Sequence, residues 1–299
     1  MPAALLPPPT SVDAVMLESR ASSLAKRSIK SSAKLEGITL AIACTDLTTL
    51  EGKDSEGRVR SLCAKAIAPR PSWPSVPSVA AVCVYPNFVA IAKDALRGSE
   101  VKVASVATAF PSGLSRIDVR LADVAAALDA GADEIDMVID RGAFLSGHER
   151  AVYDEISAVK ALCGEKHVKA ILESGELGTY DNIRRASDLA LEAGADVIKT
   201  STGKVATNAT FATALLMCEA IRDFARRTGK RRGLKVAGGV RTTKQALTYL
   251  VIIKETLGDA WLAPELFRIG ATSLLDDLLM QLEKEATGHY AGPDYIPKD

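Results

Sequence analysis

The sequence has no surplus of charge and only a few scattered cysteines, and both shortages exclude classes of protein. Its 37 basic and 37 acidic residues cancel at neutral pH. One basic run, "RRTGKRRGLK", is short and better explained as a solvated helix end and loop than as a nucleic-acid site. The odd number of cysteines and their lack of C-x-x-C spacing indicate neither a disulfide framework nor a zinc site, and favour a reducing, cytosolic compartment. They are Cys44, Cys63, Cys83, Cys163 and Cys218.

The sequence also lacks a long apolar run. None reaches the roughly 18 residues needed to cross a membrane, so we expect no membrane partner. The opening "MPAALLPPPTS" is interrupted by prolines and lacks the basic start of a secretory signal. We expect residues 11–35 to form an amphipathic helix capped by Ser11 or Asp13, within a partly flexible extension over residues 1–36.

From about residue 37 onward, short β-branched runs alternate with helical runs, which is typical of βαβ units and a parallel sheet. Eight strands in about 250 residues fit a closed (β/α)8 TIM barrel better than an open doubly wound sheet. No G-x-G-x-x-G follows the first strand, which weakens a dinucleotide-binding alternative. We therefore predict an α/β barrel over residues 37–286 and a mobile tail over residues 287–299. The expected strands are residues 38–44, 78–85, 102–110, 132–139, 167–174, 195–201, 233–239 and 266–272.

Two stretches of the chain resemble each other: "ALDAGADEID" and "ALEAGADVIK". Their alignment matches Asp136 with Lys199, on the expected fourth and sixth strands. Since alternate strands of such a barrel contribute side chains to one interior layer, the acid and the amine should share a level. The fifth and seventh strands are similar in "VKAIL" and "LKVAG", which matches Lys169 with Lys235. Four charged side chains should thus converge at one barrel mouth, as a catalytic site or as a structural salt-bridge cluster.

Lys199 ends an apolar strand, where a lysine either extends to water or has its charge tuned for chemistry. A neutral lysine can attack a carbonyl, and the resulting protonated imine accepts electrons when an adjacent carbon–carbon bond breaks. Half-neutrality near pH 7 requires a pKa lower by roughly 3 units, of which an ammonium about 6 Å away supplies about 2. Lys235 is the candidate neighbour, partial burial could supply the rest, and Asp136 could carry protons through water.

Glycine-containing turns follow the expected seventh and eighth strands. The first contains Gly238 and Gly239 in "AGGVR", and the second contains Gly270, Thr272 and Ser273 in "GATSLL", before a helix. Loops after the last two strands of such barrels frequently hold phosphate, which helix N-termini also favour. Either turn alone could be only a tight turn, but together they predict a small phosphorylated substrate.

These motifs resemble those of the 2-deoxyribose-5-phosphate aldolases, class I aldolases built on a (β/α)8 barrel. The resemblance covers about residues 38 to 276. It implies reversible cleavage of 2-deoxy-D-ribose 5-phosphate to D-glyceraldehyde 3-phosphate and acetaldehyde, in deoxyribonucleotide catabolism, with no metal or organic cofactor. The family's Schiff-base lysine matches Lys199, its second catalytic lysine matches Lys235, and its proton-relay aspartate matches Asp136. The shared motifs are "CTDLTTL", "CVYPNF", "GADEIDMVI", "ILESGEL", "ADVIKTSTGKVATNAT", "LKVAGGVR" and "RIGATSLL".

The resemblance also implies residues that line the family's pocket, which match Asp46, Thr48, Cys83, Thr202 and Lys204, and its phosphate site, which matches Gly239 and Ser273. Cys83 is better explained as a small core side chain than as a nucleophile. Together with the residues from the strand and turn patterns, the candidate substrate-binding set is Asp46, Thr48, Cys83, Lys169, Thr202, Lys204, Gly238, Gly239, Gly270, Thr272 and Ser273.

The sequence departs from the family's pattern at both ends and in the turns. "KVAGG" lacks the proline that many members have before Ala-Gly-Gly, and Thr272 stands where many have a serine. Members often end in a tyrosine on a mobile tail, a role open here to Tyr290 or Tyr295, while the N-terminal extension resembles that of longer eukaryotic forms. Two alternatives stay open: a transaldolase-like Schiff-base enzyme and a phosphosugar-binding barrel without catalysis. We expect a possible homo-oligomer, most simply a dimer.

Overall fold

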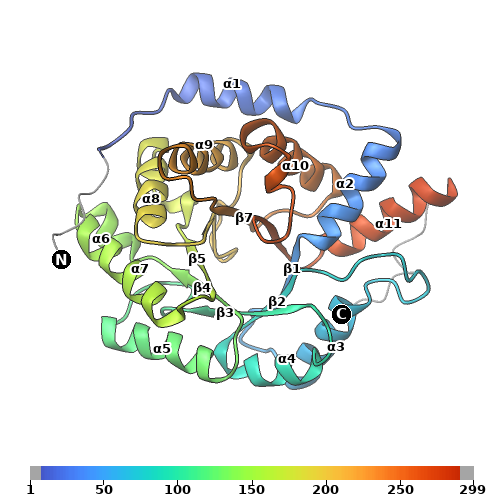
Figure 1. The fold of residues 1–299 in the computed structure, drawn as a ribbon, viewed down its shortest axis with the longest axis horizontal. Coiled ribbons are helices and arrows are strands. Elements are labelled where there is room, and N and C mark those ends of the chain that lie inside the picture. Colours follow the sequence, from blue (N-terminus) through green and yellow to red (C-terminus); the bar gives the residue numbers. More distant parts are fainter. Residues whose placement is uncertain (1–7, 290–299) are drawn as a thin grey trace.

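Eight short strands pair in chain order, and β8 also pairs with β1, so the sheet closes into a parallel barrel (Figure 1). The structure is a computed structural model that describes residues 8–289. The (β/α)8 TIM barrel expected from the alternation of patterns is confirmed. The strands are β1 (Thr45–Thr48), β2 (Ala81–Val84), β3 (Lys102–Ala107), β4 (Glu134–Val138), β5 (His167–Ile171), β6 (Val197–Lys199), β7 (Gly233–Ala237) and β8 (Phe267–Ala271).

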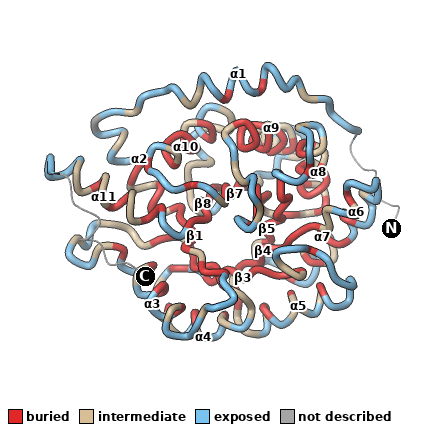
Figure 2. The backbone as a smooth tube through the Cα atoms, turned by 180° about the vertical axis from the view of Figure 1, so that it is seen from behind, coloured by how far each residue is buried: buried red, intermediate tan, exposed pale blue. Residues whose placement is uncertain are grey.

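Helices surround the barrel and cover the outward-facing side chains of its strands. Figure 2 shows the inner strands as buried, whereas the outer surfaces of the helices are exposed. The α-helices that follow the first strand are α3 (Glu56–Ile67), α4 (Val89–Ala95), α5 (Ile117–Asp129), α6 (Arg141–Leu145), α7 (Glu149–Cys163), α8 (Tyr180–Glu192), α9 (Phe211–Thr228), α10 (Thr243–Leu257) and α11 (Leu274–Thr287). Three 3-10 turns are η1 (Pro86–Phe88), η2 (Ser174–Glu176) and η3 (Asp259–Trp261).

The prediction of a strand at residues 38–44 is wrong. These residues form the end of helix α2 (Ser31–Ala43) and its C-cap, and the first strand begins only at Thr45. Their β-branched content suggested a strand, but the fully buried positions follow helical spacing, since α2 buries one face against α10 and α11. Those positions are Ile38, Ala41 and Ile42.

The N-terminal extension is more than the single helix that we expected over residues 11–35. Helix α1 (Ala14–Ala25) is capped by Asp13, whose carboxylate accepts a hydrogen bond from the backbone N–H of Met16 at 2.9 Å. The chain then leaves the helix before α2 begins, and α2 runs across the expected boundary between residues 36 and 37. Helix α1 packs against α9 and α10 on the outside of the barrel (Figure 1).

The C-terminal tail begins after α11. Tyr290 and Tyr295, to which the sequence left the role of a terminal tyrosine, lie outside the described residues. Among the helices of residues 8–289, none is long and apolar enough to cross a membrane.

Candidate active site

Seven charged side chains enter the barrel from six of its strands. The backbone register pairs Asp136 on β4 with Lys169 on β5, and it pairs Lys235 on β7 with both Lys199 on β6 and Arg268 on β8. Parallel strands with such a register bring these side chains to neighbouring levels of the interior. The full set is Asp46, Glu134, Asp136, Lys169, Lys199, Lys235 and Arg268.

Six of the seven form a closed ring of ion pairs in which acids and bases alternate, here called the ion-pair ring. The ring runs Asp136, Lys235, Asp46, Arg268, Glu134, Lys169 and back to Asp136, with N···O distances of 2.7, 2.6, 2.7, 2.7, 2.6 and 2.7 Å. No member's side chain is more than 7% exposed. Three carboxylates and three cations cancel, so the ring is neutral when every member is ionised.

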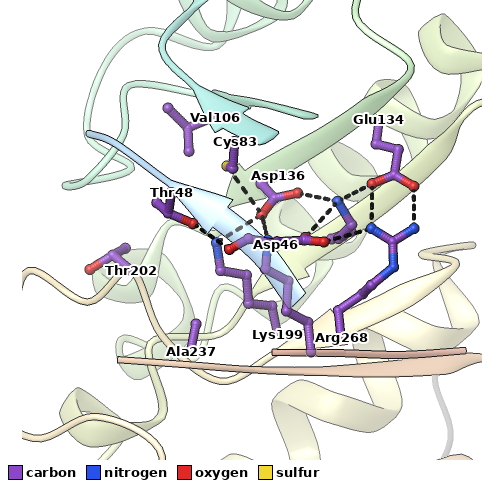
Figure 3. A network of polar contacts seen from close by, with 12 residues as sticks. Asp46, Thr48, Cys83, Val106, Glu134, Asp136, Lys199, Thr202, Ala237 and Arg268 are labelled. Carbon is purple, nitrogen blue, oxygen red and sulfur yellow. Dashed lines mark hydrogen bonds and ion pairs between the residues drawn. The ribbon is translucent and has the colours of Figure 1, made fainter. Parts of the chain in front are cut away.

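Lys199 is the seventh charged side chain, and it contacts the ring from the side of the cavity. Its Nζ lies 2.8 Å from Oδ2 of Asp136, the oxygen that also contacts Nζ of Lys235 (Figure 3). Lys199 is 3% exposed, and it lines a cavity that the fully buried Lys169 and Lys235 do not line. The structure therefore brings together the four residues that the sequence predicted to converge, with Lys199 facing the cavity.

The same surroundings act differently on the three lysines. Burial lowers the pKa of Lys199, Asp136 opposes this effect, and the nearby Lys235 lowers the pKa further, so the result lies below the ordinary value. Burial acts in the same direction on Lys169 and Lys235, but the carboxylates beside them outweigh it and raise the pKa of both. Lys199 is therefore the lysine of this cluster that loses a proton most readily, as a nucleophilic amine must.

Asp136 is held as a carboxylate. Burial alone would raise its pKa, but Lys169, Lys199 and Lys235 outweigh burial and keep the pKa of Asp136 well below its usual range. An ionised Asp136 can accept a proton or hold a water molecule between itself and a substrate oxygen, which are the functions that a proton relay needs.

A cavity of about 250 Å³ lies above Lys199 at the carboxyl ends of the strands. Most of the predicted substrate-binding residues line it, and they come from the carboxyl ends of β1 and β8 and from the loops after β6, β7 and β8. These lining residues are Thr48, Thr202, Lys204, Gly238, Gly239, Gly270, Thr272 and Ser273. Active sites of such barrels lie at this face, because its loops combine side chains from several strands.

One end of the cavity suits an anion. Ser273 is the N-cap of α11, and its side chain makes no capping hydrogen bond, so the first turn of α11 keeps donors for a ligand. The acids of this turn are engaged elsewhere: Asp277 accepts from Thr243, and Asp276 pairs with Lys65. Arg58 and Arg241 also line the cavity, and the sequence analysis singled out neither, although Arg241 ends the turn "AGGVR".

The loop after β7 requires glycine at position 238 because another loop approaches it closely. A Cβ built on Gly238, which has φ of +78°, would lie 2.3 Å from Oδ1 of Asn208. Gly239 has a similar φ of +77°, but its nearest neighbour in the same test is 4.0 Å away. The approach at Gly238 holds the loops after β6 and β7 against each other at the cavity wall.

The loop after β6 is also held from its other side, by Glu173. This buried residue has a left-handed backbone with φ of +54°, which is costly for a residue other than glycine. Its carboxylate accepts hydrogen bonds from the backbone N–H of Thr202 at 3.2 Å and from the Thr202 hydroxyl. The Thr202 oxygen in turn accepts from the backbone N–H of Lys204 at 3.1 Å. Glu173 therefore positions two residues that line the cavity.

Three of the predicted substrate-binding residues do not line the cavity. Asp46 and Lys169 are members of the ion-pair ring beneath it, and both are fully buried. Cys83 is also fully buried, with Sγ 3.9 Å from Oδ2 of Asp136, and burial raises the pKa of its thiol to about 11. The Cys83 thiol is thus protonated at neutral pH and packs as a small side chain, whereas Asp46 and Lys169 act on the site through the ring.

Glu134 and Arg268 complete the ring, and the sequence analysis did not single them out. A signal was present, because Glu134 precedes Asp136 by two positions and so points to the same side of β4. Arg268 likewise precedes Gly270 by two positions on β8. Pairing between side chains so far apart in the chain requires the closed barrel, which is why the sequence alone did not connect them.

Within the described part of the chain, no group of three or more His, Cys, Asp or Glu side chains is arranged to hold a metal ion. The carboxylates at the barrel centre are occupied by the lysines and by Arg268.

A closed (β/α)8 barrel with a buried lysine of lowered pKa beneath a cavity is the arrangement that Schiff-base chemistry needs. Comparison with known proteins agrees: the model of the DeoC/LacD family aldolase matches residues 40–278. The chain belongs to this family.

Individual relatives are similar over most of their length. The deoxyribose-phosphate aldolases of Mus musculus and Homo sapiens are each 45% identical to this chain over 283 residues, which cover 91% of the chain and 89% of the relative. Among solved structures, QR15, described as an aldolase, matches with a TM-score of 0.67 and 26% identity, over 82% of this chain and 97% of its own.

Proposed function

We propose that this protein is a class I aldolase that reversibly cleaves 2-deoxy-D-ribose 5-phosphate to D-glyceraldehyde 3-phosphate and acetaldehyde. The observation that carries the proposal is the position of Lys199, a buried amine with a lowered pKa at the floor of a cavity whose far end suits an anion. The names of the relatives that are 45% identical support the choice of substrate.

Lys199 supplies the covalent step. Its neutral Nζ attacks C1 of the open-chain sugar. The C1 oxygen takes one proton from the attacking nitrogen and one from solvent, relayed by Asp136, and leaves as water, which gives the protonated imine. Removal of the proton from the C3 hydroxyl then breaks the C2–C3 bond, and the electron pair of that bond moves toward the imine nitrogen. This step releases glyceraldehyde 3-phosphate and leaves an enamine. Protonation of the enamine at C2, followed by hydrolysis, releases acetaldehyde and restores the amine.

Asp136 and Lys235 assist this chemistry in different ways. Asp136, 2.8 Å from Nζ of Lys199, relays protons through water to and from the carbinolamine oxygen and the C3 oxygen. Lys235 chiefly favours the neutral form of Lys199, because two ammonium groups that share one carboxylate oxygen repel each other. The other end of the substrate, its phosphate, binds at Gly238, Gly239 and Ser273.

The experiment is a direct assay with 2-deoxy-D-ribose 5-phosphate, in which glyceraldehyde 3-phosphate is detected by a coupled reductase. The proposal predicts product formation that Lys199→Ala abolishes while the fold, followed by circular dichroism, is retained. A transaldolase-like enzyme would instead transfer a unit from a ketose phosphate. A phosphosugar-binding protein without catalysis would bind the substrate and form no product.

Two further expectations also belong to this proposal. All five cysteines are buried thiols without disulfide partners, which supports a reducing, cytosolic compartment. The expected homo-oligomer has some support in exposed apolar side chains around the start of α5, where Leu114 is 65% and Val119 is 51% exposed. Light scattering on the purified protein would give the number of subunits.

A further inference from the structure

The ion-pair ring has a far half that touches neither the cavity nor Lys199. Glu134 contacts Lys169 and Arg268, and Arg268 contacts Glu134 and Asp46, on the side of Asp136 that faces away from Thr48 and Thr202 (Figure 3). Neither Glu134 nor Arg268 lines the cavity above Lys199. Two charged side chains 5% exposed at the centre of a barrel are costly to desolvate, and apolar side chains would fill the same space without that cost.

The balance of charge in the cluster offers a reason why Glu134 and Arg268 are charged despite the cost of burying them. The ring contributes three carboxylates and three cations, whereas the protonated Lys199 adds a fourth cation with no carboxylate of its own. Each cation of the ring contacts at least two carboxylates, while Asp136 is the one carboxylate of residues 8–289 within ion-pair distance of Lys199. A buried cluster with an excess positive charge loses a proton most readily from the cation with the fewest carboxylate partners, which is Lys199.

We propose that Glu134 and Arg268 are positioning residues whose opposite charges offset each other within the ion-pair ring, so that the basicity of Lys199 is set by the balance of charge in the whole ring and not by Lys235 alone. They act through Asp46, Lys169 and Lys235 rather than on the substrate. The inference rests on the proposed function only in giving Lys199 its imine chemistry, because the balance of charge is a property of the folded protein.

The direction of the pKa shifts agrees with this proposal. Lys199 is the lysine of the cluster whose pKa is lowered, whereas the carboxylates raise the pKa of Lys169, Lys235 and Arg268 above their ordinary values. Two thiols also face the cluster, and both stay neutral because burial raises the pKa of Cys83 to about 11 and of Cys44 to about 12. The groups that face Lys199 or the ring are thus Asp46, Glu134, Asp136, Lys169, Lys235, Arg268, Cys44 and Cys83.

The proposal predicts the sign of each perturbation. Glu134→Gln removes a negative charge, so the cluster becomes more positive and the pKa of Lys199 should fall. A unit charge at about 10 Å in a medium of effective dielectric about 20 shifts a pKa by roughly one unit, which is a tenfold change in the neutral fraction. The double variant Glu134→Gln/Arg268→Gln removes one charge of each sign, so the pKa of Lys199 should return to near its starting value.

The experiment measures the basicity of Lys199 without using the sugar. The protein and its variants react with a trace of acetic anhydride at a series of pH values, and mass spectrometry follows acetylation of Lys199 relative to the exposed Lys230. We expect the profile of Lys199 to move to lower pH by about one unit in Glu134→Gln and to move back in the double variant. Arg268→Lys keeps the charge and should leave the profile in place.

Several results would overturn the proposal. If Glu134→Gln slows acetylation equally at every pH, Glu134 is only a structural support. If the double variant moves the profile as far as the single one, charge balance is not the cause. Circular dichroism checks that each variant is folded, and the double variant avoids an unmatched buried charge. If the unaltered protein shows the expected acetylation profile but does not cleave the sugar, the result counts against the proposed function alone.

Discussion

Replacing Lys235 by leucine tests how the site makes Lys199 neutral. The 2.7 Å and 2.8 Å contacts of Lys235 and Lys199 with the same oxygen of Asp136 limit the separation of the two Nζ atoms to about 5.5 Å. At an effective dielectric of about 20, repulsion over this distance is about 3 kcal/mol, or roughly 2 pKa units. Lys235→Leu should therefore raise the pKa of Lys199 and lower its neutral fraction at neutral pH about a hundredfold.

The assay is the pH dependence of kcat/KM for cleavage of 2-deoxy-D-ribose 5-phosphate, from about pH 6 to about pH 10. We expect the activity of Lys235→Leu to recover as the pH rises, because the neutral amine returns without help from its neighbour. Lys235→Arg keeps the charge and serves as the matched control. A profile that falls in height but keeps its shape would refute the electrostatic role and leave Lys235 as a direct proton donor.

Three other predictions follow from the geometry. Ser273→Glu puts a carboxylate at the N-terminus of α11, so affinity for the phosphorylated sugar should fall while unphosphorylated deoxyribose is affected much less; equal losses would mean that the phosphate binds elsewhere. Gly238→Ala should lower the melting temperature more than Gly239→Ala, since the two glycines share a left-handed backbone and differ in their distance to Asn208; equal losses would refute the close approach. The folded-state pKa values of Asp46 and Asp136 are lowered, so the stability that these carboxylates add is present above their unfolded pKa of about 4 and is lost as the pH falls below that value. We therefore expect the melting temperature to decrease as the pH is lowered from about 4, and a constant melting temperature over this range would contradict the prediction.

The sequence predicted the barrel because its signal is local and repeated. Each strand is a short apolar run, and each helix has its own periodicity, so seven of the eight expected strands overlap observed ones. The exception, residues 38–44, shows the limit of a composition argument. Ile38 and Ile42 favour a strand by residue type, but the packing of α2 against α10 and α11 decides for a helix.

The residues of the candidate site could be predicted where the sequence repeats a motif, but not where their contacts depend on the closing of the barrel. The internal similarity of two stretches pointed to Asp136 and Lys199, which lie in contact. The alternation of buried and exposed positions does not show which side chains form ion pairs. The pair of Glu134 and Arg268 could therefore be identified only from the structure, in which β4 and β8 face each other across the barrel. For the same reason, Lys169 was assigned to the substrate pocket although it lies below it.

The most direct test of the central claim is to trap the imine. The protein is incubated with acetaldehyde and sodium borohydride, digested, and analysed by mass spectrometry for lysines that carry an ethyl group. The account predicts an adduct on Lys199 that is absent from Lys199→Ala and far weaker on Lys169 and Lys235, whose ammonium groups the ring holds protonated. An adduct on Lys235 in place of Lys199, or sugar cleavage by Lys199→Ala at an undiminished rate, would contradict it.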